Sequence, residues 1–391
     1  MRDPRFHAWV FTEMPYPYLP AEEGFDSVRV TLPNRLYDPE AGYELYRKYF
    51  DIYAAADRLG LDIMLNEHHS TATCLNVSVP MSAAIVARET RRARLLVLGN
   101  PVANRREPVR VAEEMAMADV LSRGRLEVGF VRGVPNEISA QNANPATTKE
   151  RFWEAADLIV RAWTSHDGPV NWEGEHFHAR QLNIWPRPYQ QPHPPVWVPT
   201  QSLATAAEVA ERQYHLATIL SGTEAARRMF DVYREASAAR GAPAPGPERF
   251  GYCGLVFTGE TDEEGRAGAR LLQWYLQHNK VAPQFNDPPG YYDVARRAEL
   301  LARRAAGPLI ESPVAHLATA DIGGLIDEGM VFAGSPASVQ AQITEFDERV
   351  GGCANLLMMV QAGTMSYETT VRSMELFATE VLPALRRVPG P

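Results

Sequence analysis

The run Leu59-Gly60-Leu61-Asp62-Ile63-Met64-Leu65-Asn66-Glu67-His68-His69 contains the end of a predicted helix, a short strand and a polar turn. Helical periodicity over Tyr43–Leu59 places aromatic residues on one face, and glycine commonly follows the end of such a helix. The segment Asp62–Asn66 has the length of a buried strand, and an acid and two histidines follow it directly. Ligands of parallel α/β proteins bind beyond the carboxyl ends of the strands, so both imidazoles are candidates for proton transfer or for holding a metal.

Apolar segments of strand length recur along the chain and alternate with helical patterns. We predict eight strands, at Phe6–Phe11, Asp62–Asn66, Leu95–Gly99, Leu126–Val131, Val196–Pro199, Leu216–Leu220, Gly251–Phe257 and Asn355–Val360. We predict helices at Tyr43–Leu59, Pro108–Leu121, Lys149–Thr164, Leu203–Arg212, Glu224–Arg240, Asp262–Val281, Pro336–Arg349 and Ser366–Leu385. This alternation predicts βαβ units and an α/β fold, a closed (β/α)8 TIM barrel. An open doubly wound sheet is the rival, but no Gly-x-Gly-x-x-Gly motif follows the first strand.

Two segments interrupt the repeat within what we predict to be a single domain, residues 1–391. Residues Asp167–Pro195 are rich in Pro, His and Trp, which indicates a hairpin or an irregular excursion. Residues 283–330 form a long insertion between the seventh and eighth strands. Such an insertion is either a lid over the site or an additional packing layer.

Composition excludes several classes of protein. The chain has 391 residues, of which 45% are hydrophobic and 22% charged, and a net charge of −9, which argues against binding to nucleic acid. The three cysteines lie far apart without a Cys-x-x-Cys pair, so neither a zinc knuckle nor a disulfide framework is expected. No leader pattern or apolar segment of membrane-spanning length is found, so we expect a cytoplasmic protein without a membrane partner.

A metal site is the less favoured interpretation of the two histidines. The predicted ends of strands five to eight offer no His or Asp that would complete a ligand set. His176 and His178 lie in the irregular segment before strand five, where surface positions are expected. We therefore predict no metal, and a proton-handling role for the first pair.

Two neighbouring strands end in groups that suit an anion. Arg132 and the flexible Gly133 follow strand four, and the hydroxyls of Ser202 and Thr205 lie at the beginning of the helix after strand five. Guanidinium groups and helix N-termini both bind phosphate, whereas each hydroxyl taken alone could simply cap its helix. The pair of strands favours a cofactor that carries phosphate.

Strand three ends in Gly99 and Asn100. The glycine permits unusual backbone angles, and the amide can hydrogen-bond a planar heterocycle. A simple turn is the alternative interpretation.

Several further segments occur in a specific order and spacing. They are Ala56-Asp57-Arg58-Leu59-Gly60-Leu61-Asp62, Glu67-His68-His69, Glu107-Pro108-Val109-Arg110-Val111-Ala112-Glu113-Glu114, Ser122-Arg123-Gly124-Arg125-Leu126, Gly129-Phe130-Val131-Arg132-Gly133, Arg151-Phe152-Trp153-Glu154, Gly174-Glu175-His176-Phe177, Pro186-Arg187-Pro188-Tyr189-Gln190, Pro195-Val196-Trp197-Val198, Ala210-Glu211-Arg212 and Phe332-Ala333-Gly334-Ser335-Pro336. With these segments, essentially the whole chain resembles the bacterial luciferase-like flavin monooxygenases, whose fold is a (β/α)8 barrel.

The resemblance implies that reduced FMN binds at the mouth of the barrel. Arg132, Ser202 and Thr205 stand where the family holds the phosphate, and Val134 contributes backbone there. Gln201 stands beside them, where family members often have an acid.

Further roles follow from the same resemblance. Gly99 and Asn100 stand where a peptide that is often cis approaches the flavin ring. His68 stands at the position of the catalytic histidine, with Glu67 and His69 as its support.

The implied reaction is monooxygenation. Reduced flavin and O2 form a C4a-hydroperoxide that oxygenates a small organic substrate, and a separate flavin reductase supplies the reduced flavin. Val131 replaces a reactive cysteine of luciferase itself, so light emission is not implied. A shell of aromatic residues could keep the site dry, namely Phe6, Trp9, Phe11, Trp274 and Tyr275. Ordinary core packing is the alternative interpretation and accounts for most of them.

Two alternatives stay open at this point. The same barrel supports hydride transfer from a deazaflavin, and luciferases also contain a non-catalytic partner subunit. Family members are commonly dimers, so a homodimer or heterodimer is expected.

Overall fold

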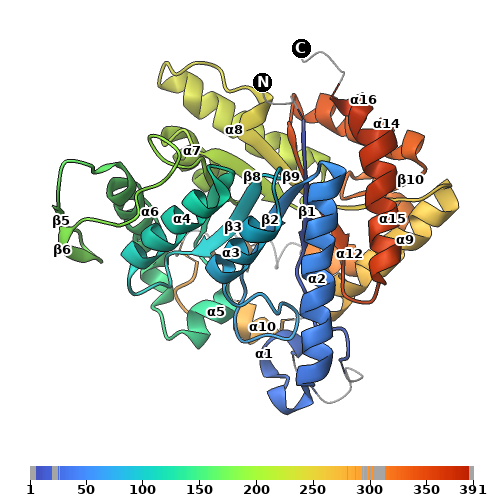
Figure 1. The fold of residues 1–391 in the computed structure, drawn as a ribbon, viewed down its shortest axis with the longest axis horizontal. Coiled ribbons are helices and arrows are strands. Elements are labelled where there is room, and N and C mark those ends of the chain that lie inside the picture. Colours follow the sequence, from blue (N-terminus) through green and yellow to red (C-terminus); the bar gives the residue numbers. More distant parts are fainter. Residues whose placement is uncertain are drawn as a thin grey trace.

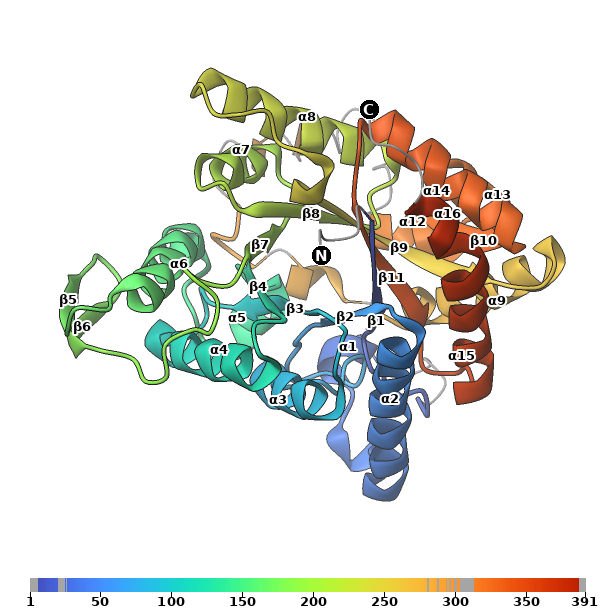
Figure 2. The ribbon, with the colours of Figure 1, turned by 45° about the horizontal axis from the view of Figure 1, so that its top comes forward.

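The computed structural model describes residues 6–19, 25, 27–279, 281–286, 288–292, 294, 297–298, 301–302 and 313–386. Eight parallel strands close into a barrel surrounded by helices, so the predicted TIM barrel is confirmed (Figure 1, Figure 2). In the order of their pairing, the strands are β1 (His7–Thr12), β2 (Asp62–Leu65), β3 (Leu95–Pro101), β4 (Leu126–Val131), β7 (Val196–Pro199), β8 (His215–Ile219), β9 (Phe250–Thr258) and β11 (Asn355–Gln361), which pairs with β1.

Helices pack around this ring and connect its strands. The longer helices are α2 (Pro39–Leu59), α3 (Val79–Glu89), α4 (Pro108–Ser122), α6 (Thr148–Thr164), α7 (Leu203–Glu211), α8 (Thr223–Ala239), α9 (Asp262–His278), α14 (Pro336–Val350) and α15 (Tyr367–Leu376). Short helices are α1 (Val28–Thr31), α5 (Pro135–Ala140), α10 (Pro283–Asn286), α12 (Pro313–Thr319), α13 (Ile322–Asp327) and α16 (Leu382–Leu385), with 3-10 turns at Asn34–Leu36, Pro145–Thr147 and Pro247–Arg249. In the described part of the chain, no helix combines the length and the apolar character needed to cross a membrane.

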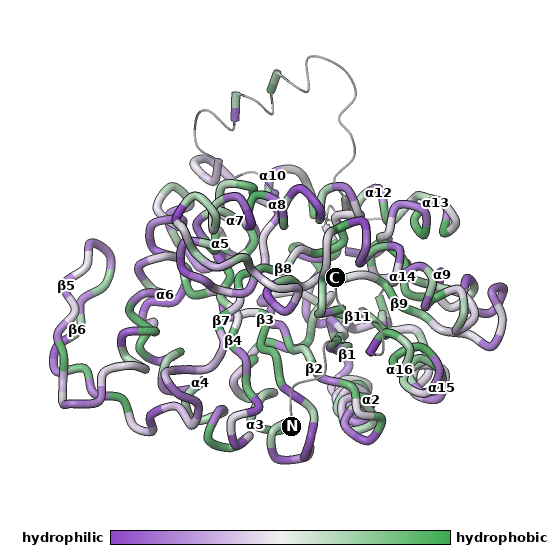
Figure 3. Tube along the Cα trace, turned by 90° about the horizontal axis from the view of Figure 1, so that it is seen from above, coloured by the Kyte–Doolittle hydropathy of each residue, from purple (hydrophilic) through white to green (hydrophobic). Residues whose placement is uncertain are grey.

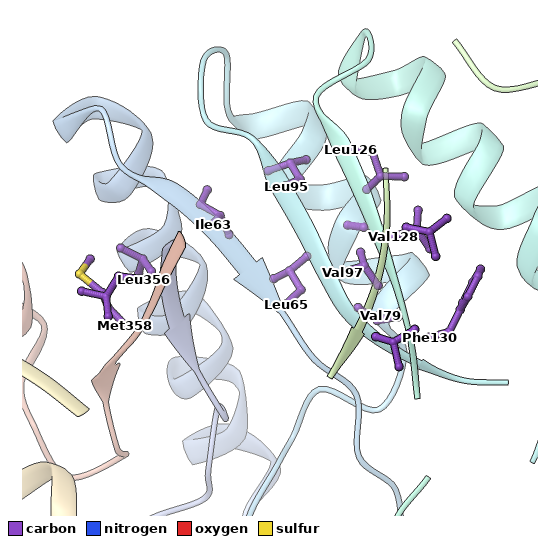
Figure 4. Close-up of a cluster of buried hydrophobic side chains, with 14 of the residues drawn as sticks. Ile63, Leu65, Val79, Leu95, Val97, Leu126, Val128, Phe130, Leu356 and Met358 are labelled. Atoms are coloured by element: carbon purple, nitrogen blue, oxygen red, sulfur yellow. The ribbon is translucent and has the colours of Figure 1, made fainter. Parts of the chain in front are cut away.

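The strands are buried on both faces because side chains alternate between the barrel interior and the helix layer. Figure 4 shows Ile63, Leu65, Leu95 and Val97 among the buried side chains that pack with Val79 of α3. The intervening residues of the same strands fill the barrel, together with those of β1, namely Trp9, Phe11, Met64, Leu96 and Leu98. The interior is therefore a packed core, and space for a ligand lies beyond the strand ends.

An additional strand, β10 (Val331–Gly334), lies outside the ring and was not predicted. Residues 250–253 of the long strand β9 pair with β8, and residues 255–258 pair with β10. An apolar run of four residues does not distinguish a strand from a helix segment, so the pattern was too short to detect.

The irregular segment before strand five contains an antiparallel hairpin, as one of the two predicted outcomes. Its strands are β5 (Val170–Glu173) and β6 (His178–Leu182), and the hairpin stands at the edge of the molecule, away from the barrel (Figure 3). The predicted helix Ser366–Leu385 is divided instead by a π-helical turn at Phe377–Val381. Pro383 explains this division, because it cannot donate a backbone hydrogen bond to the preceding turn.

Candidate functional site

The strand order brings the predicted site residues to neighbouring strand ends. In the ring, β1, β2, β3, β4 and β7 are consecutive. Pro101 pairs with Val131, and Gly129 pairs with Trp197, so the residues that follow β3, β4 and β7 emerge side by side. Helices α1, α5 and α10 lie together at one end of the barrel in Figure 1.

His68 lies directly after β2 and is held between two carboxylates. Its Nδ1 lies 2.7 Å from Oε1 of Glu137, and its Nε2 lies 3.8 Å from Oε2 of Glu13. The side chain is 20% exposed, whereas that of Glu137 is only 2% exposed. Asn66 donates from Nδ2 to the same oxygen of Glu13 at 2.5 Å. The imidazole is thus fixed in orientation but accessible at its edge.

His69 bridges two acids. Its Nε2 lies 3.1 Å from Glu67 and its Nδ1 lies 3.4 Å from Glu137. Glu67 also accepts hydrogen bonds from Nη2 of Arg105 at 2.6 Å and from the backbone N–H of Val79 at 2.8 Å. Since Val79 begins α3, the carboxylate also neutralises the positive end of that helix. Glu67 and His69 therefore belong to the same hydrogen-bonded network as Glu137 and His68.

Contacts within this network raise the pKa of its histidine His69 and lower the pKa of its carboxylate Glu137. Hydrogen bonds to Glu137 and Glu67 raise the pKa of His69 to about 9, although burial opposes this. Burial would raise the pKa of Glu137, but hydrogen bonds from both histidines and the charge of Arg29 outweigh it and lower the pKa to about 2. Glu137 is therefore an anion near neutral pH and can only accept hydrogen bonds. Consequently Nδ1 of His68 is the donor to Glu137, and Nε2 is the ring nitrogen that this hydrogen bond leaves available.

The elements predicted for phosphate binding end adjacent strands. The guanidinium of Arg132 lies 4.1 Å from the ring centroid of Tyr291, from the insertion, and Arg132 forms no ion pair with any residue that the structure describes. Ser202 is the N-cap of α7 and accepts from the N–H of Thr205 at 3.4 Å, so the capping role expected as the alternative is present. Gln201 donates to the carbonyl of Ile219 at 2.9 Å, and Val134 is the N-cap residue of α5.

The end of β3 has the backbone and polar groups that were expected to face a planar ring. The peptide between Leu98 and Gly99 is cis. Asn100 is fully buried and donates to the carbonyl of Gly129 at 3.2 Å, and its Oδ1 has no hydrogen-bond partner among the described residues. Both polar atoms of the nearby Asn104 are likewise buried without described partners. These groups, with Arg132, which has no ion-pair partner in the described part of the chain, are chemically suited to a phosphorylated heterocycle that accepts and donates hydrogen bonds.

The predicted aromatic shell is correct only in part. Trp274 lies beside Gly363, which follows β11, and Phe11 pairs with Met359 near the end of that strand. Phe6 and Trp9, in contrast, lie toward the amino ends of the strands, where Trp9 is opposite Asp62. The direction of β1 places these two residues away from the site, so the prediction that they shield it is wrong.

Several residues of the site were not predicted. Glu13 follows β1, Glu137 lies in α5, and Arg29 lies in α1, each at the same end of the barrel as His68. Glu13 directly follows the first strand and Glu137 comes shortly after the Arg-Gly element, so the sequence offered a signal for both, whereas Arg29 lies outside recognisable motifs. Within the described residues, no group of three or more His, Cys, Asp or Glu could hold a metal ion. His178 is exposed at the start of β6.

The fold and the site define a (β/α)8-barrel protein with an arginine, a helix N-terminus and an imidazole–carboxylate network at the carboxyl ends of its strands. The chain belongs to the luciferase-like monooxygenase family, whose model matches residues 29–352.

Two relatives illustrate this membership. An uncharacterized protein of Sinorhizobium fredii is 31% identical over 220 residues, which are 53% of this chain and 63% of that protein. The oxygenase component of the flavin-dependent trigonelline monooxygenase of Acinetobacter baylyi is 30% identical over 168 residues, 42% of this chain and 46% of that protein. The matches thus span less than two thirds of either relative.

Solved structures share the fold over nearly the full chain. The oxygenating constituent of 3,6-diketocamphane monooxygenase from Pseudomonas putida, in complex with FMN, matches with a TM-score of 0.72, 21% identity and coverage of 99% of both chains. An F420-dependent secondary alcohol dehydrogenase matches with a TM-score of 0.65 and 14% identity, covering 89% of this chain and 96% of that chain.

Proposed function

We propose that this protein is the oxygenase component of a flavin-dependent monooxygenase that uses reduced FMN and O2 to oxygenate a small organic substrate. One observation supports this most: consecutive strands β2, β3, β4 and β7 end in His68, Gly99-Asn100, Arg132 and Gln201-Ser202. This order gives a proton-transfer group, a place for a ring and a place for a phosphate along one arc of the barrel.

Each element has a distinct role in this proposal. Arg132 and the N-terminus of α7 at Ser202 and Thr205 would bind the phosphate, since both present N–H groups to an anion. The backbone of Val134 and the amide of Gln201 would line the same end. Gly99 and Asn100 would orient the ring, and the buried Oδ1 of Asn100 is available to accept a hydrogen bond.

The chain would also manage the proton of the reaction. Bound reduced flavin supplies the activation of O2. His68 would hold or release a proton at Nε2, because its Nδ1 is occupied by Glu137. Phe11, Trp274 and Tyr275 would exclude water from the space above the strands.

The reduced flavin would come from a separate flavin reductase. The Acinetobacter relative is named as an oxygenase component, which supports a two-component system. A non-catalytic partner subunit is the less favoured role, because His68 and Arg132 are both present. If the chain nevertheless had that role, His68→Asn would leave the turnover of the assembled enzyme unchanged.

Cofactor binding tests the proposal. Anaerobic titration of the protein with reduced FMN and, separately, with reduced F420 distinguishes the two cofactors. F420 is included because a structural neighbour with the same fold depends on it. We expect saturable binding of reduced FMN that is at least about tenfold tighter than binding of F420. Tighter binding of F420, or no binding of reduced FMN, would contradict the proposal.

A further inference from the structure

Arg29 is a buried cation that the roles above do not use. It lies in α1, in the segment between β1 and α2, and the residue is 6% exposed. Its Nη1 donates to Oδ1 of Asn279 at 2.8 Å, which ties α1 to the residue that follows α9. The residue therefore reaches across the end of the barrel.

The opposite edge of its guanidinium is free. Nε and Nη2 are both buried and have no hydrogen-bond partner among the described residues. These two nitrogens present parallel N–H groups, the geometry in which arginine binds a carboxylate through two hydrogen bonds. A buried charged donor without an acceptor is costly, so its retention at this position calls for an explanation.

The neighbouring carboxylates of Glu137 and Glu13 form no hydrogen bond with Nε or Nη2 of Arg29. Oε1 of Glu137 lies 3.8 Å from Nη2, beyond hydrogen-bonding distance, and accepts instead from His68 and from the backbone N–H of His69. Glu13 accepts from Asn66 and faces Nε2 of His68. Nη2 of Arg29 and Nδ1 of His68 thus both approach Oε1 of Glu137, which links the guanidinium to the imidazole that the proposed reaction uses.

The other edge of the guanidinium is held by a chain of hydrogen bonds. Asn279, which accepts from Nη1 of Arg29, also accepts from Thr73 at 3.2 Å and donates to the hydroxyl of Tyr275 at 3.1 Å. These contacts fix the guanidinium in place, while its Nε–Nη2 edge makes no hydrogen bond among the described residues.

We propose that Arg29 is a substrate-binding residue that selects small organic acids, by receiving their carboxylate on its Nε–Nη2 edge beside His68. This inference rests on the proposed function, since it names the substrate class for the same site. Because both nitrogens are shielded from solvent, the side chains that cover them move when the carboxylate binds.

Calorimetric titration with acetate and benzoate, and with acetamide and benzamide as uncharged counterparts, tests the inference on the full chain with and without FMN. We expect each carboxylate to bind about tenfold or more tightly than its amide. Arg29→Met should abolish that preference, and Arg29→Lys, which keeps the charge but lacks the two-pronged edge, should reduce it. Arg35→Met, a change of the same charge at an exposed position nearby, should leave it intact.

The outcomes separate the two proposals. Equal binding of carboxylates and amides by the wild-type chain, or an unchanged preference in Arg29→Met, would overturn the role of Arg29, and the first result does not depend on any variant folding. If FMN fails to bind while the carboxylate preference depends on Arg29, the flavin proposal fails and the anion site stands.

Discussion

Nδ1 of His68 and Oε1 of Glu137 lie 2.7 Å apart, although 69 residues separate them in the sequence. The carboxylate comes from α5, beyond β4, and the imidazole from the end of β2. This contact fixes which imidazole nitrogen faces the site. It also places a permanent negative charge beside a group that would change its own charge during turnover.

Replacing Glu137 should slow the reaction. Glu137→Gln keeps the shape of the side chain but removes the anion that accepts from Nδ1 of His68 and orients the imidazole. We expect the substrate-dependent rate of reoxidation of bound reduced FMN by O2 to fall by about tenfold. Stopped-flow absorbance measures this rate.

Replacing His68 itself provides the comparison. His68→Asn should lower the substrate-dependent rate by roughly 10² or more, while the affinity for reduced FMN stays near that of the wild type. Equal rates in the wild type, Glu137→Gln and His68→Asn would show that neither residue handles the proton.

His69 should make stability depend on pH. Its pKa of about 9 in the folded chain lies above the ordinary value of 6.5, so its contribution is complete below pH 6.5 and is lost as pH rises through 9. We expect the free energy of unfolding to fall by about 1 to 2 kcal/mol over this window, after allowance for solvent screening. Urea denaturation at several pH values should give a smaller fall in His69→Gln, whereas the exposed variant His178→Gln should behave like the wild type.

Asp57 should stabilise the barrel without taking part in the site. Its carboxylate accepts from the backbone N–H groups of Arg91, Arg92 and Ala93 at 3.0, 2.7 and 2.6 Å, which fixes the turn before β3 to the end of α2. Asp57→Ala should lower the free energy of unfolding by about 3 kcal/mol, since three backbone donors, of which that of Ala93 is buried, lose a charged acceptor. Asp51→Ala, at an exposed position of the same helix, should cost little, and both variants should still bind reduced FMN. A small effect for Asp57→Ala would contradict this structural role.

The parts of the molecule that follow a local pattern could be predicted from the sequence. The eight strands of the ring have continuous apolar runs, and glycine or proline residues separate them from helices, so the barrel was predictable. His68, Arg132 and Ser202 immediately follow strands or begin helices, and parallel topology alone places such residues at one end.

Contacts between distant segments could not be predicted in this way. Glu137 and Arg29 lie in helices of six and four residues, whose sequences carry no periodic signal. Their partners depend on how loops fold across the barrel, which no spacing rule specifies. Strand β10 was not predicted for a related reason. Its four residues pair with the later part of β9, beyond the residues of β9 that pair with β8 in the ring.

The central claim is that the ends of β4 and β7 hold the phosphate of reduced FMN, and one comparison tests it most directly. Anaerobic titrations measure the affinity for reduced FMN and for reduced riboflavin, which lacks the phosphate, in the wild type, in Arg132→Met and in Arg161→Met at an exposed position of α6. We predict that the wild type and Arg161→Met prefer FMN by about 10² and that Arg132→Met loses most of this preference. Equal affinity for the two flavins in the wild type, or an undiminished preference in Arg132→Met, would contradict the account.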